Sequence, residues 1–264
     1  MTLLSVDRVS KSYRQGGLFD RRPPRQVLQG AGLSITAGEC VGLLGPSGCG
    51  KSTLARLILG IEAPDSGAVL LDGAPLAGRG RPDAVQARRD IQAVFQDPFG
   101  ATNPRFTAFE VVAEPLRNFD RLSGPALRAR VDGLLRQVGL DPAESGKPAH
   151  RFSGGQLQRL CIARALAPGP RLLILDEAVS SLDMTTQGRI LDLLAELRRR
   201  SGIAYLFITH DIRLVPGFCD RAVVIEDGRT VAVGDIAAPA VRCETLELLR
   251  DAVLPPMPVA RTAS

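Results

Sequence analysis

A glycine-rich segment, Gly45-Pro-Ser-Gly-Cys-Gly-Lys-Ser52, constrains the fold of this chain more than any other part of the sequence. It follows a short apolar stretch at Val41–Leu44 and precedes Lys51–Leu59, in which leucine and isoleucine recur at helical spacing. The pattern G-x-x-x-x-G-K-[ST] between a strand and a helix is typical of a phosphate-binding loop. The order strand, loop, helix therefore predicts an α/β fold with a nucleotide site at this turn.

The residue types of this loop explain how it would hold phosphate. Its glycines let backbone N–H groups close around phosphate oxygens, and the N-terminus of the following helix adds a favourable dipole. Lys51 is expected to contact the β- and γ-phosphates, and the hydroxyl of Ser52 to ligate Mg²⁺. The nucleotide-binding residues predicted here are Gly45, Pro46, Ser47, Gly48, Cys49, Gly50, Lys51, Ser52 and Thr53.

A second carboxylate-bearing segment completes this site. In Leu172-Leu-Ile-Leu-Asp-Glu177, four apolar residues predict a buried strand that delivers two carboxylates at its C-terminal end. We expect Asp176 to hold the magnesium shell and Glu177 to polarise the attacking water as general base. An apolar run that ends in Asp-Glu is a weak signal alone, and it becomes a strong one in a chain that carries the phosphate-binding loop.

A third motif lies between these two halves, within the 125 positions that separate Lys51 from Asp176. Ser153-Gly-Gly-Gln156 is a Ser/Gly-rich turn that enters a predicted helix. It offers a hydroxyl at Ser153 and bare backbone at Gly154 and Gly155, so it could bind an anion at a helix N-terminus. Taken alone, the same four residues are better read as a helix N-cap, and it is their place between the other two motifs that favours anion binding.

The remaining sequence indicates how the chain is organised. Short half-apolar segments up to Ile35 predict an antiparallel β layer, and aliphatic segments after residue 172 that alternate with a helical pattern predict buried parallel strands. Helical spacing between about 97 and 168 predicts a helical subdomain. We expect a single domain over 1–252 and a C-terminal tail over 253–264.

Composition argues against other classes of protein. No window approaches the roughly 18 uninterrupted apolar residues of a membrane span, and five scattered cysteines suit a reducing compartment better than a disulfide framework. The net charge of +5 comes from dispersed arginines, and two Tyr and no Trp offer little for base stacking. We therefore expect no nucleic-acid partner.

The order of the three motifs resembles that of the ABC ATPase family, and the resemblance covers essentially the whole chain. It implies a P-loop core with an antiparallel β subdomain and a helical insert, ATP and Mg²⁺ as cofactors, and two subunits that clamp ATP between them. In such a pair, Ser153 to Gln156 would complete the partner's ATP site. An isolated subunit is then expected to hydrolyse ATP poorly.

The resemblance also assigns roles to single residues. Gln96 is similar to the glutamine that contacts Mg²⁺ and the attacking water and links the core to the helical insert. Asp183, in Ser180-Ser-Leu-Asp183, is similar to the loop that crosses the dimer interface. His210 is similar to the histidine that contacts the γ-phosphate and orients Glu177, and Tyr13 stands where an aromatic ring stacks on adenine.

Two groups of segments point to one branch of this family. Arg88–Pro98, Asn103-Pro-Arg105 and Glu114-Pro115 resemble the branch of peptide and nickel importers. Leu172–Val179 and Leu249–Pro255 are most similar to its nickel-import ATP-binding subunits. The resemblance therefore implies an energy-coupling ATPase that drives nickel uptake.

The partners implied are a second ATPase subunit of different sequence, two transmembrane permease subunits and a periplasmic substrate-binding protein. The chain would be peripheral, on the cytoplasmic face of the bacterial inner membrane. Dipeptide or oligopeptide import remains an alternative, because no His/Cys/carboxylate cluster at metal-ligand spacing supports nickel independently. A soluble ABC ATPase that acts on DNA or ribosomes is less well supported, because the chain has one cassette and a short insert.

Overall fold

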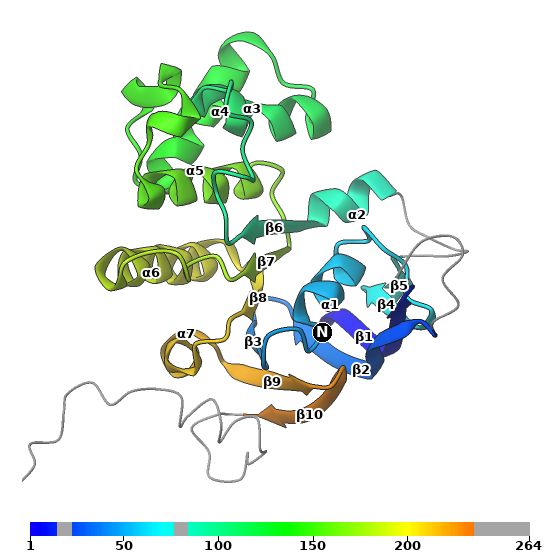
Figure 1. Cartoon of the computed structure of the whole chain (residues 1–264). Coiled ribbons are helices and arrows are strands. Elements are labelled where there is room, and N and C mark those ends of the chain that lie inside the picture. Colours follow the sequence, from blue (N-terminus) through cyan, green and yellow to red (C-terminus); the bar gives the residue numbers. More distant parts are fainter. Residues whose placement is uncertain (15–22, 77–83, 235–264) are drawn as a thin grey trace, which may run out of the picture.

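Two β-sheets enclose helix α1 (Lys51–Ile58) in the computed structural model, which describes residues 1–14, 23–76 and 84–234 (Figure 1). The first sheet has the strand order β2-β1-β4-β5, and its neighbouring strands are antiparallel. Its strands are β1 (Thr2–Tyr13), β2 (Arg25–Thr36), β4 (Ser66–Leu71) and β5 (Ala74–Pro75). The antiparallel layer predicted from the N-terminal segments is confirmed.

The second sheet carries the α/β core. Its strand order is β10-β9-β3-β8-β7-β6, in which β10 is antiparallel to β9 and all other neighbours are parallel. Aliphatic runs suit this position because a parallel sheet is covered on both faces. The strands are β3 (Cys40–Leu44), β6 (Ile91–Phe95), β7 (Leu172–Asp176), β8 (Ala204–Ile208), β9 (Arg221–Glu226) and β10 (Arg229–Gly234).

Strand β6 is the main element that the sequence pattern did not assign. Residues 91–95 follow helix α2 (Ala84–Asp90) and pair in parallel with β7, from Ile91 beside Leu172 to Phe95 beside Asp176. A five-residue apolar run next to a helical pattern is ambiguous, because periodicity alone cannot separate a buried strand from a buried helical turn. The sheet therefore extends beyond the segments predicted, by β6 at one edge and by β10 at the other.

The stretch between β6 and β7 is helical, as its spacing predicts. It contains α3 (Ala108–Phe119), α4 (Gly124–Gln137) and α5 (Gly154–Leu166), with short 3₁₀ turns at η1 (Pro142–Gly146) and η2 (Ala149–Arg151). After β7 come α6 (Met184–Ser201), η3 (Ile212–Leu214) and α7 (Val215–Phe218). Figure 1 shows α3, α4 and α5 grouped beyond the β6 edge of the sheet.

Two apolar clusters hold these layers together. One fills the space between the two sheets around α1, and the other joins α3, α4, α5 and α6 to the opposite face of the parallel sheet. Polar contacts link the sheets at their edges, where Gln29 donates its backbone N–H to Gly228 O at 2.8 Å and Thr230 Oγ1 donates to Gly32 O at 2.7 Å. Helix α1, which follows the glycine-rich loop, is thus fixed between two layers.

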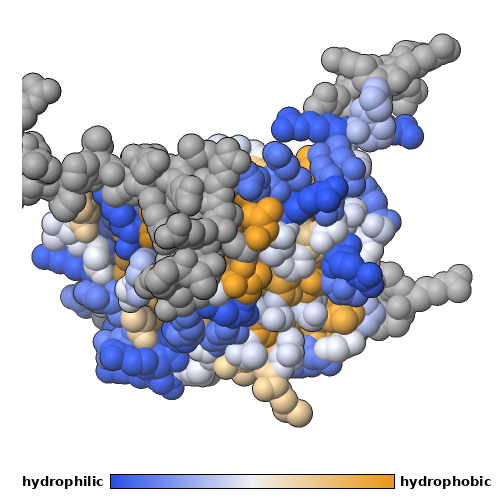
Figure 2. Space-filling model, turned by 90° about the horizontal axis from the view of Figure 1, so that it is seen from below, coloured by the Kyte–Doolittle hydropathy of each residue, from blue (hydrophilic) through white to orange (hydrophobic). Residues whose placement is uncertain are grey.

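The surface is predominantly polar where the structure can be followed. Figure 2 shows the face seen from below, on which hydrophilic residues surround scattered apolar ones. The edge strand β10 exposes Val231 and Val233. Among the helices of the described ranges, none combines the length and apolar character needed to cross a bilayer.

Candidate functional site

The register of three parallel strands brings the chemical groups to one edge of the sheet. Phe95, Asp176 and Ile208 lie side by side in β6, β7 and β8. The chain leaves this row at Gln96 and Glu177, and His210 follows two residues after Ile208. Because the carboxyl ends of parallel strands meet at the same edge, residues far apart in sequence converge here.

The glycine-rich loop leaves β3 at the same edge and needs glycine for its shape. Gly50, directly before α1, has φ 112°, and a Cβ there would lie 2.7 Å from Leu28 Cδ2. A Cβ on Gly45 would lie 2.2 Å from the carbonyl oxygen of Ile225. Both positions therefore exclude side chains, which leaves the backbone N–H groups of the loop free to approach a phosphate.

Lys51 is held inside this loop. Its side chain donates hydrogen bonds from Nζ to the carbonyl oxygens of Gly45 at 2.6 Å and Pro46 at 2.9 Å, and only 7% of its surface is exposed. Lys51 also lines a pocket at this loop. The other residues lining that pocket are Val27, Ser47, Gly48, Gly50, Ser52, Thr53, Arg56 and Glu177. The predicted base thus faces the same pocket as the phosphate-binding residues.

Asp176 sits at the end of β7 in an environment that disfavours its charge. Burial and the neighbouring charge of Glu177 raise the pKa of Asp176, whereas Lys51, Arg56 and a hydrogen bond with Ser52 act in the opposite direction. A cation placed beside such a carboxylate stabilises its charged form, which burial otherwise disfavours. Together with the Ser52 hydroxyl it offers the hard oxygen donors that Mg²⁺ prefers.

Glu177 adopts a backbone conformation that non-glycine residues rarely take. Its φ is 50°, and three hydrogen bonds hold it there: its N–H donates to Ile208 O at 3.0 Å, and Ser180 donates to its carbonyl from N at 3.1 Å and from Oγ at 2.9 Å. Strain of this kind costs on the order of 1–3 kcal/mol and persists where surrounding contacts enforce it. The turn directs the carboxylate away from the strand and toward the pocket.

His210 is the side chain that meets this carboxylate. Its Nδ1 lies 3.3 Å from Oε1 of Glu177, and its side chain is 54% exposed, against 24% for that of Glu177. The other histidine, His150, contacts the carbonyl of Pro104 through Nδ1 at 3.1 Å and lies outside this site. The structure therefore pairs the two residues that were predicted to act together.

The Ser153 turn forms a capping box at the start of α5. Ser153 Oγ accepts from Gln156 N at 3.3 Å, and Gln156 Oε1 accepts from Ser153 N at 3.1 Å. A Cβ on Gly155 would lie 2.5 Å from Thr186 Cγ2 at the start of α6, so glycine is required by packing within this chain as well. The N-cap interpretation of this motif is thus correct for the local structure, and it leaves the first N–H groups of α5 at the surface of the turn.

Three further predicted residues have local contacts in the fold. Asp183 caps α6 by accepting from Thr186 N at 2.9 Å. The carbonyl of Gln96 accepts from Ser181 Oγ at 3.2 Å, which connects the end of β6 to the loop before α6. Tyr13 donates to Glu62 Oε2 at 2.6 Å and is absent from the lining of the Lys51 pocket.

Motif reasoning assigned no role at this site to two of its residues. Arg56 lines the Lys51 pocket, and its positive charge acts to lower the pKa of Asp176. Ser180 holds the backbone of Glu177 as described above. Arg56 could have been found from its place on α1 one turn after Ser52, because residues four apart share a helix face.

Comparison with known proteins places these observations in a family. A family model described as ABC transporter matches residues 28–180, which include the glycine-rich loop, Ser153 to Gln156, and Asp176 with Glu177. This chain belongs to the ABC transporter family, and its fold is that of the ABC ATPases.

Particular relatives share this sequence over nearly its whole length. It is 49% identical to the nickel import ATP-binding protein NikE of Rhodospirillum rubrum, over 98% of this chain and 94% of the relative. The proteins of the same name from Escherichia coli O6:K15:H31 and Brucella suis biovar 1 are 46% and 45% identical, each over 98% of its own length. The similarity thus extends well beyond the motifs.

Solved structures agree with the fold. CbiO1 of Clostridium perfringens, described as part of the ABC transporter complex CbiONQ, superposes with a TM-score of 0.76 at 33% identity, covering 89% of this chain and 88% of the other. The ATP-binding cassette MJ0796, solved as a dimer in a post-hydrolysis state with ADP and phosphate, gives a TM-score of 0.77 at 31% identity, covering 89% and 100%.

Proposed function

We propose that this chain is the energy-coupling ATPase of a nickel importer, in which ATP hydrolysis at the edge of the parallel sheet drives ion uptake through separate permease subunits. The observation that carries the proposal is the convergence of Lys51, Asp176, Glu177 and His210 at that edge. Relatives named as nickel import ATP-binding proteins match along almost the whole chain and support the cargo.

The chemistry follows from the positions of these groups. Lys51 binds the β- and γ-phosphates beside the backbone N–H groups of the loop, and neutralises charge there. Glu177 accepts a proton from the attacking water. The strained turn directs the Glu177 carboxylate into the pocket, and the carboxylate in turn positions the water against the γ-phosphate. His210 orients Glu177 across their 3.3 Å contact and can donate to the γ-phosphate.

Magnesium fits the donor set. The Ser52 hydroxyl, the Asp176 carboxylate and the Gln96 amide are oxygen donors of the type that Mg²⁺ takes, and the raised pKa of Asp176 means that an adjacent cation would relieve its unfavourable burial. When bound, the ion would offset the charge that develops on the phosphate oxygens.

A second ATPase subunit, which we propose to differ in sequence, completes each site. The N-terminus of α5, with Ser153, Gly154 and Gly155, is absent from the lining of the pocket that contains Lys51 and Glu177, so we assign the phosphate it binds to the partner's site. Asp183, which caps α6, lies in the loop that we assign to the dimer interface. Tyr13 is proposed to stack on adenine, with its hydroxyl anchored on Glu62.

The permease is proposed to dock in a groove beside Gln96. A cavity of about 580 Å³ lies between the end of α1, β6 and α3, and its lining includes Ile61, Phe95 and Phe119. Ile61 and Phe95 are 65% and 41% exposed, and neighbouring Phe99 is 53% exposed. The same lining includes Arg88, Glu114 and Arg164, so the recess is amphipathic. A recess of this kind, next to the residue that links core and helical insert, suits a permease segment at the cytoplasmic face of the inner membrane.

Uptake of ⁶³Ni²⁺ tests the function directly. Cells that lack this chain are complemented with the wild type or with Lys51→Ala, and the expectation is that only the wild type restores uptake. Uptake that is unchanged by the deletion would remove nickel as the cargo, and dipeptide uptake is then the next assay.

Ile61→Ser tests the proposed docking of the permease. We expect this variant to retain ATP binding and to co-purify less with the permeases and a periplasmic binding protein.

A further inference from the structure

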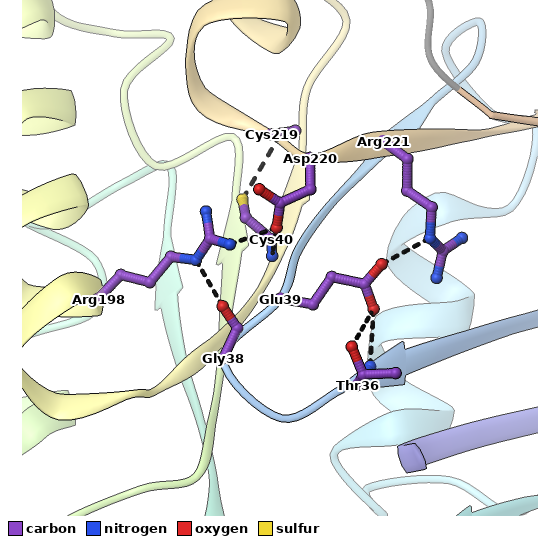
Figure 3. Close-up of polar contacts among 8 residues, drawn as sticks. All are labelled: Thr36, Gly38, Glu39, Cys40, Arg198, Cys219, Asp220 and Arg221. Carbon is purple, nitrogen blue, oxygen red and sulfur yellow. Dashed lines mark hydrogen bonds and ion pairs between the residues drawn. The ribbon is translucent and has the colours of Figure 1, made fainter. Parts of the chain in front are cut away.

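Two cysteines lie in contact at the edge of the parallel sheet opposite the nucleotide site. Cys40 is the first residue of β3, and Cys219 directly follows α7 and is separated from β9 by Asp220. Their Sγ atoms are 3.6 Å apart, although 179 positions separate them in the sequence (Figure 3). The other described cysteines lie elsewhere: Cys49 Sγ is near Lys51 Nζ at 4.0 Å, and Cys161 Sγ is near the carbonyl of Pro98 at 3.9 Å.

The backbones on either side of the pair are fixed to each other. Asp220 N donates to Cys40 O at 2.9 Å, and the Asp220 carboxylate accepts from Cys40 N at 2.9 Å. Arg198 holds the same carboxylate and donates from Nε to Gly38 O at 2.7 Å (Figure 3). A disulfide needs its sulfurs about 2.05 Å apart, so rotation of the two side chains would have to bring the Sγ atoms closer than their 3.6 Å separation by about 1.5 Å.

The two thiols differ in access. Cys40 is fully buried, whereas Cys219 is half-buried and lines a surface cavity of about 520 Å³ between α6 and α7. Arg198 and Arg199 also line that cavity. The contact with Cys40 and burial raise the pKa of Cys219, which lowers the fraction of thiolate at neutral pH, so we expect its reaction with peroxide to be slow and to require excess oxidant.

We propose that Cys40 and Cys219 are a modification site at which a hydroperoxide forms a reversible intrachain disulfide. Cys219 Sγ attacks the peroxide, its S–O bond forms as the O–O bond breaks, and water or an alcohol leaves. Cys40 Sγ then attacks Cys219 Sγ, the S–S bond forms as the S–O bond breaks, and the hydroxyl leaves as water with the thiol proton of Cys40; the thiol proton of Cys219 has left with the first leaving oxygen. The thiols lose two electrons, the peroxide gains them, and a dithiol reductant reverses the step.

The bridge would fasten the segment that carries His210. Residues 209–219 join β8 to Cys219, and α7 within them packs on β3, where a Cβ on Gly42 would lie 3.0 Å from Val215 Cγ1 and 3.3 Å from Cys219 Sγ. Strand β3 leads in turn into the phosphate-binding loop. Oxidation would therefore link the C-terminal end of the segment 209–219 covalently to β3, and we expect it to slow ATP turnover. The effect on ATP turnover rests on the proposed function, whereas the formation of the disulfide does not.

Peptide mapping tests the bond independently of activity. Trypsin releases Cys40 in the peptide 26–51 and Cys219 in 214–221. The fifth cysteine is first removed by Cys243→Ser, so that it cannot form a disulfide. Hydrogen peroxide is then expected to link the two peptides through Cys40 and Cys219, with a mass decrease of two hydrogens. Dithiothreitol is expected to separate them again. Fragmentation that places the bond at Cys49, or peroxide treatment that leaves the peptides separate, would overturn the proposal.

Variants separate the bond from general oxidation. Cys219→Ser, at the more exposed position, should fold and lose the linkage, and Cys40→Ser is a second test if it folds. We expect peroxide to reduce ATP turnover of the parent reversibly and to spare that of Cys219→Ser. Turnover is measured on the assembled transporter, because the isolated subunit is expected to hydrolyse ATP poorly. Equal inhibition of the transporter that carries Cys219→Ser would assign the loss to another thiol and refute the switch. An assembled, reduced transporter that does not hydrolyse ATP would refute the proposed function, whereas the peptide mapping would still test the bond.

Discussion

Nδ1 of His210 lies 3.3 Å from Oε1 of Glu177, although 33 positions separate the two residues. The contact arises because β7 and β8 are parallel neighbours with Asp176 beside Ile208, so both strands end at the same edge of the sheet. Glu177 is held by its turn, whereas His210 is more exposed. The carboxylate is therefore the fixed member of the pair and the imidazole the adjustable one.

The first prediction concerns how these two residues share the chemistry. Glu177→Gln should reduce kcat by about 10²-fold or more, because a general base contributes on the order of 10²–10⁴, while ATP binding is retained. His210→Ala should cost less, and the double variant should be no slower than Glu177→Gln, because residues that act as one unit are not additive. Phosphate release by the assembled transporter measures this. Fully additive losses would show that His210 acts independently of Glu177.

The second prediction concerns two glycines of the phosphate-binding loop. Gly48 and Gly50 both have positive φ, but a Cβ meets open space at Gly48 and lies 2.7 Å from Leu28 Cδ2 at Gly50. Alanine at Gly48 should cost only the conformational strain, about 1 kcal/mol, whereas alanine at Gly50 adds a clash with the core. Thermal unfolding of both variants compares them, and an equal loss of Tm would contradict the packing argument.

The third prediction separates capping from nucleotide binding at Ser153. Thr107 starts α3 with the same capping box, in which Glu110 N donates to Thr107 Oγ1 at 3.3 Å, as Gln156 N does to Ser153 Oγ. Ser153→Ala and Thr107→Ala should each reduce the free energy of unfolding by about 1 kcal/mol. Only Ser153→Ala should also reduce ATP turnover of the assembled complex. Equal turnover in both variants would limit Ser153 to a structural role.

The fourth prediction concerns the charge of Asp176. Because burial raises its pKa above that of the unfolded chain, the stability linked to its protonated form is present at low pH and is lost as pH rises through the raised pKa. Asp176→Asn should therefore raise Tm of the nucleotide-free protein at neutral pH while abolishing hydrolysis. Asp72→Asn is the matched control, because Arg171 lowers the pKa of Asp72 and loss of that charge should not stabilise the fold. A lower Tm for Asp176→Asn would contradict the assignment.

The sequence was informative where function depends on adjacent residues. The glycine-rich loop, the strand that ends in Asp176 and the Ser153 turn are contiguous, and each combines a local shape with its chemistry. Their elements could therefore be predicted from spacing and turn residues. The boundaries of the domain at 1–252 and the tail at 253–264 remain predictions, and the tail lies outside the described residues.

Contacts that depend on strand order could not be predicted in this way. The strand at 91–95, the contact of Tyr13 with Glu62 and the pairing of Cys40 with Cys219 each require knowledge of which strands are neighbours. Strand β3 lies between β8 and β9, which follow it by more than 150 positions. Nothing in local hydrophobic periodicity encodes that order, because every central strand of a parallel sheet is similarly apolar.

The row formed by Phe95, Asp176 and Ile208 also bears on how such a chain can change over generations. Exchanging one aliphatic residue for another within β6, β7 or β8 leaves the length of each strand intact. Deleting a single residue from one of them would draw its end back by about 3.3 Å and turn the following side chain to the other face of the sheet. Insertions and deletions in these three strands should therefore be far less tolerated than substitutions, even at positions that never touch nucleotide.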